Sequence, residues 1–121
     1  MIGLTTYKIL HIAAAIGLFG ALGGAAVHAG NALPREQNAL RKSIGILHGG
    51  SLLLLLVAGF GMLARLDVGL PAWAIAKLVL WFVMGGLLVL PYRAPGLART
   101  VLWSLPVLGA LAAWLGIAKP F

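Results

Sequence analysis

The chain has 121 residues, of which 62% are hydrophobic and 9% are charged. A soluble domain carries about 25% charged residues because water must wet its surface, so this composition excludes a water-soluble globular protein. The net charge of +7 comes from basic residues that flank apolar stretches, and we interpret it as attraction to membrane lipid headgroups, with no nucleic acid as a partner. Cysteine is absent, which excludes disulfides, thiolate metal sites and iron–sulfur clusters.

Four apolar stretches are long enough, at about 20 residues each, to cross the hydrocarbon core of a bilayer. We predict transmembrane helices over residues 9–30, 44–64, 72–90 and 101–118. The connecting loops are short, so neighbouring helices must be antiparallel. The expected fold is therefore an all-α membrane protein, an up-down-up-down bundle of four transmembrane helices that forms one domain over residues 1–121.

The basic residues also predict the orientation of the bundle. Five of them lie on the side of the first and third loops, namely Arg35, Arg41, Lys42, Arg93 and Arg99. Four lie on the side of the termini, namely Lys8, Arg65, Lys77 and Lys119. Cytoplasmic loops carry the excess of Lys and Arg, so we expect the first and third loops in the cytoplasm and both termini outside.

Small residues form one face of the first predicted helix. They recur at steps of three or four, at Ala13, Gly17, Gly20 and Gly24, and end at His28. Such a face either packs closely against another helix or leaves a groove for a flat ligand. Both interpretations remain open from the sequence.

The predicted helices contain no Asp or Glu, which argues against a proton-coupled exporter that carries its proton on a membrane carboxylate. Four ionisable residues remain in or near the membrane: His11, His28, His48 and Lys77. Each is also explained as an interfacial side chain or a snorkelling lysine. Intramembrane ionisable residues are nevertheless candidates for a functional site.

Depth along the helices separates these residues into two groups. At about 1.5 Å per residue, His28 and His48 should differ in depth by only about 4 Å. Two imidazoles facing each other from adjacent helices are suited to axial ligation of a b-type haem. We therefore predict His28 and His48 as metal ligands, with Arg41 and Arg93 as partners for the haem propionates.

The opposite side of the bundle offers a second group of cofactor-binding candidates. His11 and Lys77 lie there, and His11 should differ in depth from His48 by about 22 Å. The sequence alone does not decide which of the two groups forms the site.

Short motifs resemble a known family of small membrane proteins. The segment 7–12, Tyr-Lys-Ile-Leu-His-Ile, resembles the Lys-x-x-His opening of SirB-like membrane proteins. The segment 47–59 is similar to their second helix, and the segment 73–77 followed by Gly85 to their third. The same landmarks recur in the CopD copper-resistance group and in the HemJ type of protoporphyrinogen oxidase, although Ile75 stands where the HemJ pattern has a histidine.

The resemblance implies a haem-linked membrane bundle with His11, His48 and Lys77 as site residues. The leading hypothesis is a haem b-binding protein of the bacterial inner membrane, serving electron transfer or redox chemistry on a partner such as a quinol. Whether it is an enzyme is left open. One alternative is copper handling of the CopD type, although Met62 and Met84 form no Met-x-x-Met pair. Another is a cofactor-free structural or assembly subunit, either in a larger membrane complex or as a homo-oligomer.

Overall fold

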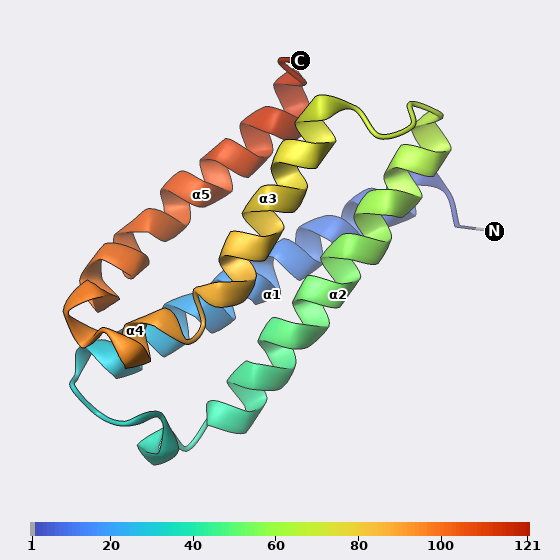
Figure 1. Ribbon diagram of the computed structural model, residues 1–121. Helices are drawn as coiled ribbons and strands as arrows, with labels where there is room; N and C mark the ends of the chain where they lie inside the picture. Colours follow the sequence, from blue (N-terminus) through green and yellow to red (C-terminus); the bar gives the residue numbers. More distant parts are fainter. Residues whose placement is uncertain (1) are drawn as a thin grey trace.

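The computed structural model describes residues 2–121, and every regular element in that range is helical (Figure 1). Four helices account for most of the chain: α1 (Leu4–Gly30), α2 (Arg41–Leu66), α3 (Ala72–Gly86) and α5 (Ala98–Ala118). Short elements complete it: η1 (Arg35–Gln37), α4 (Leu90–Arg93) and η2 (Pro95–Leu97). The all-α prediction is therefore confirmed.

Three helical segments are long and apolar enough to cross a membrane, namely Leu4–Gly30, Arg41–Leu66 and Pro95–Ala118. The first two extend several residues beyond the predicted ends. Their outer faces are apolar, and side chains such as Ile16 and Ile117 are 70% and 85% exposed. Large exposed apolar surfaces are rare on soluble monomers, so this surface suits contact with lipid.

The third predicted helix is shorter than expected. Helix α3 has 15 residues, or about 22 Å at the usual rise, whereas the prediction extended the helix to residue 90. The chain turns over residues 87–89 and then forms the single turn of α4. Pro91 explains the break, because proline has no N–H to donate and its ring clashes with the carbonyl four residues earlier.

Helices α1 and α2 pack along each other through small residues. A Cβ added to Gly17 would lie 2.6 Å from the hydroxyl oxygen of Ser51, and one added to Gly24 would lie 3.5 Å from Ile44. A Cβ on Gly20, in contrast, would meet nothing within 4 Å. Two glycines of the predicted small-residue face therefore serve close helix packing.

Helix α5 packs against α3 and against the C-terminal half of α1. Its contact with α1 is closest at the loop end, where a Cβ on Gly30 would lie 3.4 Å from that of Ala98. Further along, Gly109 meets the ring of Phe19. Beyond this point the two helices separate, and the N-terminus of α1 lies far from the C-terminus of α5 (Figure 1). The α1–α2 pair and the α3–α5 pair thus lie close together at the end of the first and third loops, and they spread apart toward the end that holds the two termini.

Candidate functional site

A cavity of about 970 Å³ lies between the α1–α2 pair and the α3–α5 pair, at the end where they spread. It follows α1 from Lys8 to Phe19 and is bounded at its inner end by Met84 and Gly109. Cofactor and small-molecule sites usually enclose about 300–1,000 Å³ and have mostly apolar walls. This cavity is at the upper end of that range, and most of its lining is aliphatic or aromatic.

The charged groups of the cavity are all basic. Three lysines line it, Lys8, Lys77 and Lys119. The two acidic residues of the chain, Glu36 and Asp67, are both outside the lining. An apolar chamber with several ammonium groups and no carboxylate suits a ligand that combines an apolar body with acidic groups.

His11 is the histidine on the wall of this cavity. Its ring lies against α2 at Gly59, where an added Cβ would stand 3.6 Å from Cε1 and 3.8 Å from Nδ1. The Nδ1 atom is buried on this side of the ring, against Gly59 and the main chain of Leu55. A ligand in the cavity would therefore reach the other ring nitrogen, Nε2.

Lys77 and Lys119 lie together at the terminal end of the cavity. The Nζ of Lys77 is 2.8 Å from the position of a Cβ on Gly116, so the ammonium lies against the last turn of α5. The C-terminus of a helix attracts cations, and the glycine leaves room for this one. The Nζ of Lys119 stands 5.4 Å from the ring centroid of Trp73, a cation–π distance. Trp73 and Lys77 are four residues apart on α3 and therefore share a face.

The structure does not bring His28 and His48 together. Gly17 faces Ser51 and Gly24 faces Ile44, and this register places His48 opposite about residue 20 of α1. His28 is eight residues further along α1, or about 12 Å. The estimate of about 4 Å assumed that the middles of the two predicted helices lie level, whereas α1 and α2 are staggered.

The two histidines also have different partners. His48 is buried, and its Nε2 lies 3.1 Å from the carbonyl oxygen of Met84. A carbonyl only accepts, so Nε2 carries the proton. The Nδ1 of His28 lies 2.7 Å from the hydroxyl of Tyr92, which also accepts a hydrogen bond from the side-chain amide of Asn38 at 3.4 Å. Spacing in the sequence did not reveal this polar cluster, because it depends on where α4 lies.

The predicted propionate partners lie away from the cavity as well. Arg41 donates from Nη1 to the carbonyl oxygen of Glu36 at 3.2 Å, and Arg93 is exposed on α4. Neither lines the cavity. Of the predicted site residues, the structure thus gathers His11 and Lys77 around one chamber. It adds Lys8, which the sequence offered only as a flanking charge and as part of the Lys-x-x-His motif, and Lys119, which it offered only as a flanking charge.

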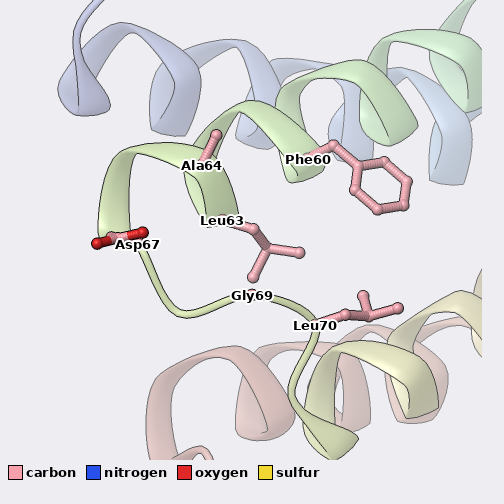
Figure 2. A pocket seen from close by; sticks show the side chains of 6 residues that line it. All are labelled: Phe60, Leu63, Ala64, Asp67, Gly69 and Leu70. Atoms are coloured by element: carbon pink, nitrogen blue, oxygen red, sulfur yellow. The ribbon is translucent and has the colours of Figure 1, made fainter.

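A second, smaller cavity of about 460 Å³ lies beside the connection between α2 and α3. Figure 2 shows its lining, which is apolar apart from Asp67, whose carboxylate points away from Phe60 and Leu70. Within residues 2–121 no group of three or more His, Cys, Asp or Glu side chains is placed to hold a metal ion. The larger cavity is therefore the better candidate for a binding site.

Comparisons with protein-family models, with curated proteins and with solved structures find no match for this chain. The functional argument accordingly depends on the fold and on the chemistry of the cavity.

Proposed function

We propose that the chain is a haem b-binding membrane protein, with the haem in the large cavity and His11 as an iron ligand. The observation that supports this most directly is the position of His11, which is the histidine in the cavity lining and whose Nδ1 is buried against α2, so that Nε2 is the nitrogen left for a ligand. Imidazole nitrogen is the commonest side-chain ligand of metals and a usual ligand of haem iron. This choice follows one of the two candidate groups in the sequence, that of His11 and Lys77.

The rest of the cavity suits the same ligand. Its volume of about 970 Å³ has room for a planar macrocycle, and Trp73 and Trp81 contribute aromatic walls. Its lysines offer partners for the two acidic side chains of haem b. When bound, haem iron supplies one-electron redox chemistry. The residues of this chain would hold the group among apolar side chains, some of which also face outward.

The proposed setting is the bacterial inner membrane, which the chain crosses four times. The third of these crossings consists of α3 together with residues 87–93, because α3 alone is shorter than a hydrocarbon core of about 30 Å. A redox partner dissolved in the bilayer, such as a quinol, reaches the cavity past lining residues that also face outward. Ile16 and Ile117, 70% and 85% exposed, are two of these.

Copper handling is less well supported. The Met84 carbonyl contacts His48, and Gly85 packs against Leu52, so Met84 lies opposite residues 48–52 of α2. Met62 is at least ten residues further along that helix, or about 15 Å. The two thioethers are therefore too far apart to share a copper ion.

Spectroscopy of purified protein tests the proposal. The wild type, expressed with haem supplied, should show a Soret band, and His11→Ala should lose it because no other cavity residue is a histidine. His28→Ala is the matched control, since it removes a histidine that is remote from the cavity, and it should keep the band. A Soret band that survives in His11→Ala and disappears in His28→Ala would overturn the assignment. A wild type that never acquires haem would favour the structural-subunit alternative, and stoichiometric copper would favour the CopD type.

A further inference from the structure

Two of the three lysines lie together at one end of the cavity. Lys119 follows the C-terminal end of α5, whereas Lys8 lies near the N-terminus of α1, far from that end. Lys77 reaches the level of Lys119, because its Nζ lies beside Gly116. The inner end, around Phe19 and Met84, offers only apolar side chains. A ligand can therefore satisfy its charges at one end only.

Lys77 and Lys119 thus place two ammonium groups at a single end of an apolar chamber. Charge-assisted hydrogen bonds are about twice as strong as neutral ones. Glu36 and Asp67 are outside the lining, so no carboxylate side chain of the cavity pairs with these lysines, and acidic groups of a ligand can do so. One acidic group would leave one of the two ammonium groups unpaired, whereas two on the same edge would pair with both.

We infer that the cavity selects for ligands with two acidic groups on one edge, and that the ammonium groups of Lys77 and Lys119 bind those groups. The inference rests on the proposed function and deepens it. Haem b would bind with its carboxylate edge toward the termini. An otherwise identical porphyrin without free carboxylates would bind more weakly. Lys77 is the principal determinant, because it is half-buried in the lining with its ammonium beside Gly116, whereas Lys119 is exposed.

Four probes test this on the full chain in detergent: haemin, haemin dimethyl ester, iron-free protoporphyrin IX and its dimethyl ester. Binding is measured by Soret titration for the first two and by porphyrin fluorescence for the others. Each diacid should bind the wild type on the order of tenfold to a hundredfold more tightly than its diester, which is the range for hydrogen bonds to charged groups. Lys77→Leu should reduce this preference severalfold or more, and Lys119→Leu provides a second variant.

Lys42→Leu is the matched control, since it removes the same charge at the loop end, outside the cavity lining. It should keep the full preference. Equal binding of diacid and diester to the wild type would overturn the inference and leave haem binding through His11 intact. Conversely, a diacid preference for iron-free porphyrin, together with haemin binding that is unchanged in His11→Ala, would support the inference and reject the proposed iron ligand. If none of the four probes binds, both proposals fail.

Discussion

The imidazole of His48 donates from Nε2 to the main-chain carbonyl oxygen of Met84, 3.1 Å away. Helix α3 ends at Gly86, so Met84 lies in the last turn, where carbonyls lack a donor from their own helix. The side chain of His48 therefore caps α3 from α2. Trp81 makes the reverse connection, donating from Nε1 to the carbonyl oxygen of Leu52 at 2.9 Å. Two side-chain hydrogen bonds thus hold α2 and α3 together beside the cavity.

The first prediction follows from this pair of bonds. His48→Leu should lower the free energy of unfolding by about 1–3 kcal/mol, because it leaves a buried carbonyl without a donor. Thermal unfolding in detergent measures the change. Trp81→Phe should cost a similar amount, and the double variant should cost less than the sum if the two bonds act together. Unchanged stability in His48→Leu would contradict the capping role.

The helical class of the protein could be predicted from the sequence because it depends on local properties, namely apolar length and the near absence of acidic side chains. The role of His48 could not. Whether that imidazole meets iron or a carbonyl depends on where α3 ends, which Pro91 decides, and on the stagger of α1 against α2. That stagger is set by contacts such as Gly17 with Ser51, and a count from predicted helix ends does not reveal it.

The cavity was equally hidden from sequence reasoning. It exists because α1 and α5 touch at Gly30 and Ala98 and then separate, which is a property of helix packing rather than of any motif. The family resemblance did indicate His11 and Lys77, and both line the chamber. Lys119 could not be distinguished from an ordinary flanking charge until the C-terminus of α5 was placed beside Trp73.

The second prediction concerns the register of α1 and α2 near the termini. The ring of Tyr7 lies directly on Gly61, where an added Cβ would overlap its carbons. Gly61→Ala should therefore destabilise the protein by about 1–3 kcal/mol through overpacking. Gly50→Ala is the control on the same helix, since its Cβ would meet nothing within 4 Å. It should be neutral or stabilise by up to about 1 kcal/mol.

A compensating variant makes this test specific. Adding Tyr7→Ala to Gly61→Ala removes the ring that the new methyl group meets, so the double variant should be more stable than the sum of the two single changes predicts. Strict additivity would show that Tyr7 and Gly61 are not in contact.

The third prediction concerns topology. Four crossings place both termini on one side, so single cysteines at Gly3 and Phe121 should be labelled from the same face. The chain has no native cysteine, which makes this labelling unambiguous. A cysteine at Gly96, in the loop before α5, should react only from the other face. Reaction of residues 3 and 121 from opposite faces would show that α3 and the segment 87–93 do not cross the membrane.

The same variants test the orientation. The first and third loops carry five basic residues against four on the terminal side, so they should be cytoplasmic. In intact cells an impermeant thiol reagent should then label residue 121 and leave residue 96 unlabelled. The reverse pattern would keep the topology and invert the protein.

The last prediction concerns the polar cluster at the loop end. The hydroxyl of Tyr92 lies 2.7 Å from Nδ1 of His28 and accepts a hydrogen bond from the Asn38 side chain, which links α4 to α1 and to the first loop. Tyr92→Phe keeps the ring near the His28 imidazole but leaves both polar partners without the hydroxyl. Since Asn38 is 9% exposed, we expect a loss of about 1–2 kcal/mol in the free energy of unfolding. Tyr7→Phe is the matched control, because Tyr7 contacts Gly61 through ring carbons, and it should cost much less.

Haem affinity should stay unchanged in Tyr92→Phe, since neither Tyr92 nor His28 lines the cavity. Equal costs for the two tyrosine variants would show that the hydroxyl of Tyr92 contributes no stabilising bond, and a loss of haem binding in Tyr92→Phe would move the site to the loop end.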